Sequence, residues 1–308
     1  MPKYRLITRS DFDGLVCAIL FKELDMIDRI LFVHPKDMQD GKVAVAAADI
    51  TTNLPYVQGV FLAFDHHLSE TLRISGHPAS HIIDPNAPSA SRVVYEYYGG
   101  KKRFPTVSDE MMDAVDKSDS GQFTQQEVLY PKKWVLLNFI MDPRTGLGRF
   151  KNFRISNYDL MMTLIDHCRH QGIEEILQLP DIQERIDLYF EQEEKFKDQI
   201  RRCSTLDENL IVLDLRDESV IYAGNRFMIY ALYPTVNISM HIMQGKMGQN
   251  TVFAVGKSIF NRTSRTDIGK LMLNYGGGGH ANAGTCQVDN DKAETVMREL
   301  IEVITVDG

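Results

Sequence analysis

The residues of this chain that could do chemistry gather in two short strings. Asp65-His66-His67 joins a carboxylate to two imidazoles, and the glycines at 276–279 are followed directly by His280. A carboxylate with imidazoles and without a thiolate is a ligand set for a hard or borderline divalent ion such as Mn²⁺ or Mg²⁺. A backbone without side chains lets amide groups approach an anion, and a histidine beside it can donate a proton. Together the strings predict a metal site and a phosphate-binding loop, as in a phosphoesterase.

Further acidic residues follow predicted strands of the N-terminal part. Asp11 and Asp13 come directly after one short apolar segment, and Asp49 comes after another. Ligands of an open parallel sheet gather outside the carboxyl ends of its strands, so we expect these carboxylates to meet the histidine string at one edge. The set exceeds what one ion needs, which favours two ions that share a bridging carboxylate. Either Asp116 or Asp119, at the end of a predicted helix, could add another ligand.

The elements that must position these residues alternate between strands and helices in the first part of the chain. This βα alternation is typical of a parallel sheet with helices on its faces. Apolar periodicity predicts strands at 4–8, 29–34, 43–48 and 60–64, and helices at 15–24, 91–98, 108–117, 131–141 and 157–170.

The C-terminal part predicts a second, smaller α/β unit behind a long amphipathic helix at 181–202. Its expected strands are 210–213, 227–232, 238–243 and 251–255, and its expected helices are 264–274 and 291–304. We therefore predict three parts, namely a metal-binding catalytic domain at 1–180, a linker helix at 181–205 and a substrate-binding domain at 206–308.

Composition narrows the class of protein. The chain has 308 residues, of which 44% are apolar and 25% charged, as in ordinary soluble proteins. It has no run of about 18 apolar residues for a membrane span, no signal peptide, and four scattered cysteines without metal-site spacing, so a reduced cytoplasm is expected. The net charge of −8 favours a small anionic substrate over long duplex nucleic acid.

At this level the chain resembles the DHH phosphoesterase superfamily, specifically members with a C-terminal DHH-associated domain. This family includes nanoRNase/pAp phosphatases and cyclic dinucleotide phosphodiesterases. The resemblance implies a two-lobed enzyme with its active site in the cleft between the lobes. It rests on Asp11-Phe12-Asp13-Gly14, Asp49, Asp65-His66-His67, Asp119-Ser120-Gly121, Asp267-Ile268-Gly269 and the segment 276–284.

The resemblance also implies a role for each motif residue. Asp65 would orient a histidine, and His67 and His280 would act on the substrate as catalytic groups. The implied metal ligands are Asp11 for a first Mn²⁺, Asp49 as the bridge, and Asp13 and His66 with Asp119 or Asp116 for a second Mn²⁺. The implied substrate-binding residues are Arg262, Gly277, Gly278, Gly279 and His280.

One residue departs from the family pattern. Members often carry a histidine before the first Asp-x-Asp that completes the first metal site, whereas this chain has Arg9 there. Arginine stays protonated and cannot ligate a metal. The first ion could bind more weakly, recruit another ligand or be absent, and Arg9 could instead hold a substrate phosphate as a further catalytic residue.

The leading hypothesis is a Mn²⁺-dependent phosphoesterase that cleaves short nucleotides with a metal-activated water. The expected substrates are di- and oligoribonucleotides, cyclic dinucleotides and pAp. One alternative is a polyphosphate- or pyrophosphate-type phosphatase, and another is a nucleotide sensor without turnover if Arg9 prevents metal pairing. Exposed helix surface, as at 157–170, could also support a homodimer.

Overall fold

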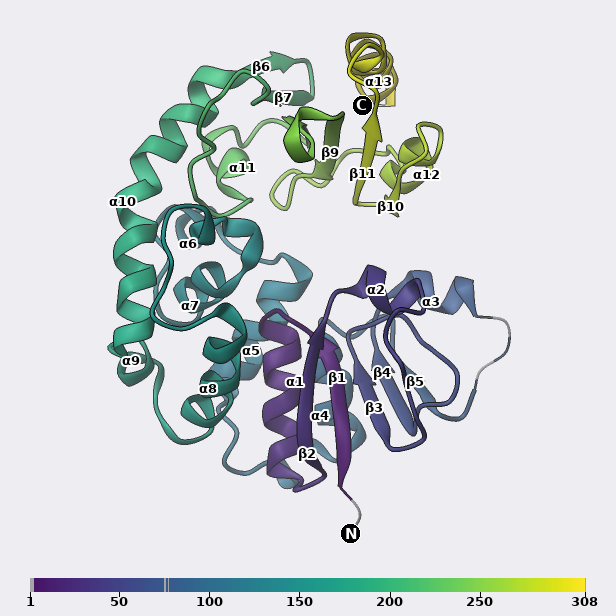
Figure 1. Ribbon diagram of the computed structural model, residues 1–308, viewed down its shortest axis with the longest axis vertical. Helices are drawn as coiled ribbons and strands as arrows, with labels where there is room; N and C mark the ends of the chain where they lie inside the picture. The colour runs from purple at the N-terminus through teal and green to yellow at the C-terminus, as the bar shows by residue number, and fades with distance from the viewer. Residues whose placement is uncertain (1–2, 75, 77, 308) are drawn as a thin grey trace. The chain divides into compact units, whose positions relative to one another are not determined.

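The computed structural model describes residues 3–74, 76 and 78–307, which form two compact units. The first unit consists of Met1–Phe123, Pro131–Pro143 and Phe150–Asp187, and the second of Thr124–Tyr130, Arg144–Arg149 and Leu188–Gly308. Each unit has its own sheet (Figure 1). The second unit thus takes in two short segments that the sequence interpretation places in the N-terminal domain.

The sheet of the first unit is entirely parallel, as expected. Its strand order is β2-β1-β3-β4-β5. Leu6 and Ile7 at its centre are fully buried, as is usual when helices cover both faces of a parallel sheet. The strands are β1 (Tyr4–Arg9), β2 (Ile27–Val33), β3 (Asp49–Thr52), β4 (Leu62–Asp65) and β5 (His81–Ile83).

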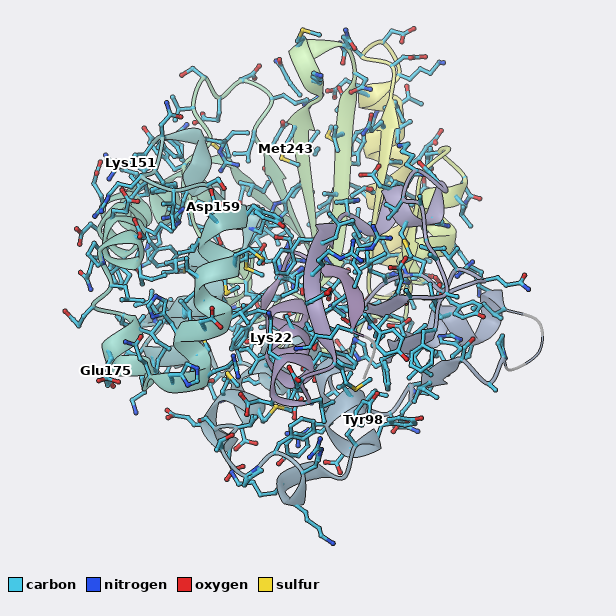
Figure 2. All side chains as sticks on the ribbon, turned by 60° about the horizontal axis from the view of Figure 1, so that its bottom comes forward. Lys22, Tyr98, Lys151, Asp159, Glu175 and Met243 are labelled. Carbon is cyan, nitrogen blue, oxygen red and sulfur yellow. The ribbon has the colours of Figure 1, made fainter. Side chains whose placement is uncertain are left out.

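Helices pack around this sheet and bury their apolar sides. Helix α1 is buried from Phe12 to Phe21 because its sequence is apolar nearly all round. Charged side chains such as Lys151, Asp159 and Glu175 are exposed to solvent (Figure 2). The helices of this unit are α1 (Phe12–Glu23), α2 (Pro35–Gln39), α3 (Leu68–Arg73), α4 (Ala90–Tyr97), α5 (Asp109–Ser120), α7 (Lys133–Met141), α8 (Asn157–His170), α9 (Ile173–Ile176) and the first part of α10 (Pro180–Cys203).

The second unit is a smaller α/β structure on a mixed sheet of order β10-β11-β9-β8-β7-β6. Only β7 and β8 run parallel among its described pairs. Its strands are β6 (Ser204–Asp207), β7 (Leu210–Asp214), β8 (Ile238–Gln244), β9 (Thr251–Lys257), β10 (Gly278–His280) and β11 (Ala283–Val288). Its helices are α6 (Gln125–Leu129), α11 (Met228–Leu232), α12 (Ile268–Leu273), α13 (Ala293–Asp307) and the rest of α10.

Two predicted strands are wrong. The segment 43–48 is an irregular, half-exposed connection in which Val43 and Val45 pack against Ile7 and its neighbours, and β3 begins only at Asp49. The predicted strand at 227–232 is the short helix α11, which is buried from Met228 to Ala231. A short apolar run carries no period that separates strand from helix, which explains both errors.

Two features bear on the expected cellular environment. Within the described residues, no helix combines the length and the apolarity that crossing a bilayer requires. Cys17, Cys168, Cys203 and Cys286 are all free thiols.

Candidate metal centre

Three side chains that are far apart in the sequence meet in the first unit. Asp13 lies in the first turn of α1, His66 directly after β4, and Asp119 in the last turn of α5. Each offers one ligand atom, and these atoms all lie within 4.8 Å of one another. His66 Nε2 lies 2.8 Å from Asp119 Oδ2. We refer to Asp13, His66 and Asp119 as the ligand cluster.

The state of His66 fits a metal ligand. Its Nδ1 lies 3.1 Å from the carbonyl oxygen of Ala87, so the N–H on this nitrogen donates to the backbone. Nε2 then faces Asp119 Oδ2 at 2.8 Å, and on losing its proton it would present the lone pair that metal-binding imidazoles use. This nitrogen is buried. A divalent ion would satisfy both this nitrogen and the two carboxylates.

The electrostatics of the cluster favour an added positive charge. Burial and the nearby charge of Asp119 raise the pKa of Asp13 to about 7. Burial alone would lower the pKa of His66, but the hydrogen bond and charge of Asp119 raise it to about 9. Asp13 holds its proton more tightly because its charged form would be repelled by Asp119. Burial alone would raise the pKa of Asp119, but the hydrogen bond and charge of His66 lower it. A divalent cation can replace those protons.

The amino end of α4 holds Asp13 in place. Asp13 Oδ1 accepts from the Ser91 amide at 2.8 Å and from Ser91 Oγ at 2.6 Å, and Oδ2 accepts from the Ala90 amide at 3.0 Å. Ser89 caps the helix, since its Oγ accepts from the Arg92 amide at 3.0 Å. Sequence reasoning missed this role, although a serine directly before a helical run is a recognisable cap signal.

Asp116 lies behind this cap and outside the ligand cluster, which corrects the alternative that it ligates a metal. Its Oδ1 accepts from Ser89 Oγ at 2.6 Å, and its Oδ2 accepts from Arg92 Nε at 2.8 Å. Asp116 thus fixes the capping serine of α4, which in turn positions Asp13. Of the two alternatives on α5, only Asp119 reaches the cluster.

Asp49 lies at the opposite end of the sheet, so the prediction that it bridges two ions is wrong. It is the first residue of β3 and pairs with Arg5 near the amino end of β1. Arg5 Nε lies 2.9 Å from Asp49 Oδ1, and Arg5 Nη2 lies 2.7 Å from Oδ2. Because the segment 43–48 is not a strand, the residue that follows the strand here is Asn53, which the sequence interpretation missed.

The other predicted residues of this unit lie at the carboxyl edge of the sheet. Asp11 caps α1 by accepting from the Gly14 amide at 3.0 Å, and Arg9 Nε lies 2.9 Å from its Oδ2.

Asp65 Oδ1 lies 2.7 Å from His67 Nδ1 and orients that ring. Burial alone would lower the pKa of His67, but this bond to Asp65 raises it. His67 therefore turns its Nε2 away from Asp65.

In the second unit, the last two glycines of the run and His280 form the edge strand β10, where the sequence suggests an open loop. Strand β10 pairs with β11, with Gly279 opposite Gly284. A Cβ on Gly277 would lie 2.1 Å from the Thr285 carbonyl oxygen, whereas one on Gly278 would meet nothing within 4 Å. His280 ends the strand in an exposed position. Gly277 and Gly279 therefore serve close backbone packing, and anion binding by this segment stays a prediction.

Arg262 belongs to the same unit and lies in the connection between β9 and α12. Its side chain is exposed, and its Nε donates to the Ile259 carbonyl oxygen at 3.1 Å. Its predicted contact with a substrate phosphate is likewise untested.

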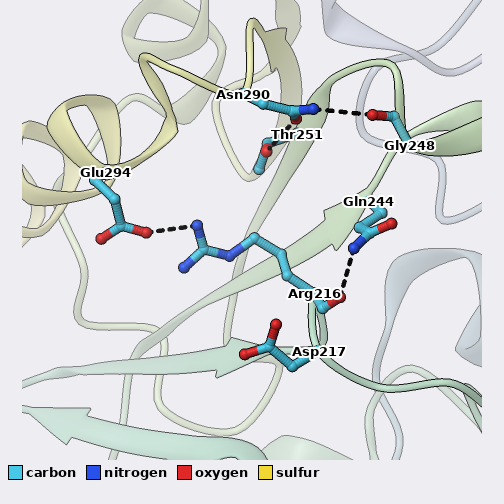
Figure 3. Close-up of a pocket in the computed structure, with 7 residues that line it drawn as sticks. All are labelled: Arg216, Asp217, Gln244, Gly248, Thr251, Asn290 and Glu294. Carbon is cyan, nitrogen blue, oxygen red and sulfur yellow. Dashed lines mark hydrogen bonds and ion pairs between the residues drawn. The ribbon is translucent and has the colours of Figure 1, made fainter.

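A pocket of about 370 Å³ lies elsewhere in the second unit (Figure 3). Its central cation, Arg216, is paired with Asp214 and lies 2.6 Å from Glu294 Oε1. Because these carboxylates neutralise the arginine, the pocket offers no positive charge for a nucleotide phosphate. The lining residues are Arg216, Asp217, Gln244, Gly248, Thr251, Asn290 and Glu294.

Comparison with known proteins places the chain in a family. No protein-family model and no curated protein matches it. Among solved structures it is similar to a pGpG-specific phosphodiesterase, PggH from Vibrio cholerae, with 62% sequence identity and a TM-score of 0.87. That match covers 99% of this chain and 100% of the other. The chain belongs to the DHH phosphoesterase superfamily.

More distant DHH proteins share the fold. RecJ from Thermus thermophilus, solved in complex with Mn²⁺, matches 97% of this chain and 52% of its own, with 13% identity and a TM-score of 0.56. CDC45 from Entamoeba histolytica matches 98% of this chain and 95% of its own, with 9% identity and a TM-score of 0.52. The match at 62% identity confirms the predicted family, the α/β fold and the enzyme class of a phosphodiesterase. The alternative of a sensor without turnover therefore has no support.

In this DHH phosphoesterase, the two acidic residues of α5 are expected to respond differently to truncation. If Asp119 ligates the ion as predicted, Asp119→Ala should lower the affinity for Mn²⁺ by at least about 100-fold with little change in stability. Asp116→Ala removes the partner that Arg92 and Ser89 bond most closely, so we expect the free energy of unfolding to fall by about 2 kcal/mol. Calorimetric Mn²⁺ titration and denaturant unfolding of both variants measure these effects. An equal loss of metal affinity in the two variants would contradict the assignment.

Proposed function

We propose that this DHH phosphoesterase hydrolyses pGpG, or a closely similar linear dinucleotide with a 5′-phosphate, to mononucleotides. The observation that carries the proposal is the full-length match, at 62% identity, to a phosphodiesterase that is specific for pGpG. The alternatives of a cyclic dinucleotide, pAp or pyrophosphate as the main substrate have no comparable support. The net charge of −8 is easier to reconcile with a small substrate in one pocket than with long nucleic acid, which needs a basic face.

We propose Mn²⁺, or Mg²⁺ in its place, as the cofactor. The oxygen-rich ligand cluster suits either ion, and RecJ structures have been solved with each. Bound there, a divalent ion supplies Lewis-acid chemistry at the phosphoryl group and lowers the pKa of an attacking water.

The protein's own residues hold the reacting groups. The amino end of α4 keeps Asp13 oriented, and the Ala87 carbonyl oxygen holds Nδ1 of His66 so that Nε2 faces Asp119. We propose that His67, fixed by Asp65, hydrogen-bonds the scissile phosphate through Nε2, and that Arg9 balances its charge. For the second unit we propose that Arg262, His280 and the backbone at 277–279 bind the substrate's far end. The active site in a cleft between the units stays a prediction.

A substrate panel tests the proposal. We expect kcat/KM for pGpG in the presence of Mn²⁺ to exceed that for cyclic di-GMP, pAp and pyrophosphate by at least about 100-fold. Each hydrolysed pGpG should give two molecules of GMP, because water adds across the one phosphodiester bond. Separation of nucleotides by liquid chromatography measures both the rate and the products. Faster cleavage of the cyclic dinucleotide or of pyrophosphate would overturn the substrate assignment.

We also propose a cytoplasmic location, which the four free cysteines support because reduced thiols are typical of that compartment. A homodimer remains a prediction to be tested by light scattering of the eluted protein. Helix α8 gives it no support through its apolar side, since Leu160, Met161 and Leu164 are buried inside the first unit.

A further inference from the structure

Asp11 lies at the same sheet edge as the ligand cluster, yet donors of this chain engage both of its oxygens. Arg9 Nε lies 2.9 Å from Oδ2. Oδ1 accepts from Asn53 Nδ2 at 3.3 Å and from the Gly14 amide at 3.0 Å. One of these donors, the guanidinium, carries a permanent positive charge. Asp11 therefore already has a counter-ion within the protein.

The residues beside Asp11 do not suit a second divalent ion. A two-ion phosphoesterase centre needs several anionic or imidazole ligands around each ion and a carboxylate shared between them. At this edge, β1 ends in Arg9, which cannot ligate, and β3 is followed by the neutral side chain of Asn53. The expected bridge, Asp49, is bonded to Arg5 at the other end of the sheet. Of the other carboxylates discussed at this edge, Asp13 belongs to the ligand cluster and Asp65 Oδ1 holds His67 Nδ1, so the carboxylate that faces Arg9 is Asp11.

We propose that Arg9, Asp11 and Asn53, here called the arginine group, stand in place of a first metal ion, so that the centre holds a single divalent ion on the ligand cluster. This inference rests on the proposed function and specifies the number of ions that it uses. An ion on Asp11 would have to displace the guanidinium or lie beside it, and like charges at such distances repel strongly.

A guanidinium in this position can also bind the substrate. It supplies fixed positive charge next to the cluster, and its remaining N–H groups suit the oxygens of a phosphate. The Arg9 side chain is 31% exposed, so a substrate phosphate can reach it. Asp11, which caps α1, holds the arginine in one orientation. This lowers the conformational entropy that Arg9 loses when the phosphate binds.

Metal stoichiometry tests the inference without relying on turnover. The native protein, loaded with Mn²⁺ and freed of excess by gel filtration, should contain one ion per chain by elemental analysis. Its electron paramagnetic resonance spectrum should be the six-line signal of an isolated Mn²⁺. The Arg9→His, Asn53→Asp double variant restores an imidazole and a carboxylate, so it should bind a second ion and give the broadened spectrum of a coupled pair. Arg9→Lys keeps the positive charge and should stay at one ion.

The outcomes separate this inference from the proposed function. Two ions per native chain, or a coupled spectrum, would overturn the single-ion centre. A correctly folded double variant, checked by circular dichroism, that still binds one ion would overturn the role of Arg9 and Asn53. If the native protein binds one ion but does not cleave pGpG, the substrate proposal fails while the inference stands. If it binds no ion at all, both fail.

Discussion

The His66→Ala protein is expected to lose at least about 1000-fold in kcat/KM for pGpG while it remains folded. His66 provides the one nitrogen of the ligand cluster, and alanine leaves only the carboxylates of Asp13 and Asp119 to bind the ion. The ring also carries little of the fold, because its polar contacts are one bond from Nδ1 to the Ala87 carbonyl and the ion pair of Nε2 with Asp119 inside the cluster itself. Loss of the ion removes the charge that stabilises the transition state.

A matched control is His167→Ala. His167 is a histidine of α8 whose Nδ1 lies 2.7 Å from Gln171 Oε1, both on the surface of the first unit. This variant should keep its activity within about 2-fold, since surface substitutions have small effects. Steady-state kinetics at saturating Mn²⁺, together with thermal melting, distinguishes lost chemistry from lost structure. If the His66→Ala protein retained a tenth of the native kcat/KM, the result would show that the imidazole is not part of the metal centre.

Gly14→Ala is expected to be the most damaging small substitution of the fold, with a loss of at least about 3 kcal/mol in the free energy of unfolding. A Cβ at this position would lie 1.9 Å from the Arg9 carbonyl oxygen and 2.8 Å from Thr8 Oγ1. Both neighbours belong to β1, the central region of the parallel sheet, and neither can move without disturbing it. The glycine lets α1 begin directly above the end of β1, which brings Asp11 and Asp13 to the sheet edge.

Gly148→Ala serves as the comparison, because a Cβ there meets nothing within 4 Å. Gly148 lies in the second unit and Gly14 in the first, so denaturant unfolding of both variants is followed by circular dichroism, which reports on both units, together with the fluorescence of the single tryptophan, Trp134, in the first. Equal stability of the two alanine variants would show that α1 shifts to make room and that the tight turn is not required.

The sequence predicted well what is local to one element. The string Asp11-Phe12-Asp13-Gly14 lies between β1 and α1 as expected, since an apolar strand, a capping aspartate and a glycine are all visible in neighbouring residues. The position of His66 after β4 was predictable for the same reason. The parallel sheet follows from the alternation of strand and helix patterns, which survives small errors in boundaries.

What the sequence could not supply was long-range register. The apolar run 43–48 looks like a strand, and this one error moved Asp49 from the amino end of β3 to its carboxyl end and hid Asn53. Likewise, the sequence near Asp116 does not reveal that its carboxylate is hydrogen-bonded by Ser89 and Arg92, because these partners lie 24 or more residues away in the chain. The glycine run was ambiguous because open loops and closely packed strands both favour glycine.

The way the second unit is assembled from the chain limits how it can be cut or exchanged. It includes α6 and residues 144–149, both of which come from the first half of the chain. Gln125 Nε2 on α6 donates to the Ala231 carbonyl oxygen at 2.7 Å, and the Gly224 amide donates to the Thr145 carbonyl oxygen at 3.0 Å. A fragment that starts at residue 188 would therefore lack part of its own core. A chimaera that takes this unit from a relative must therefore include residues 124–130, 144–149 and 188–308 together.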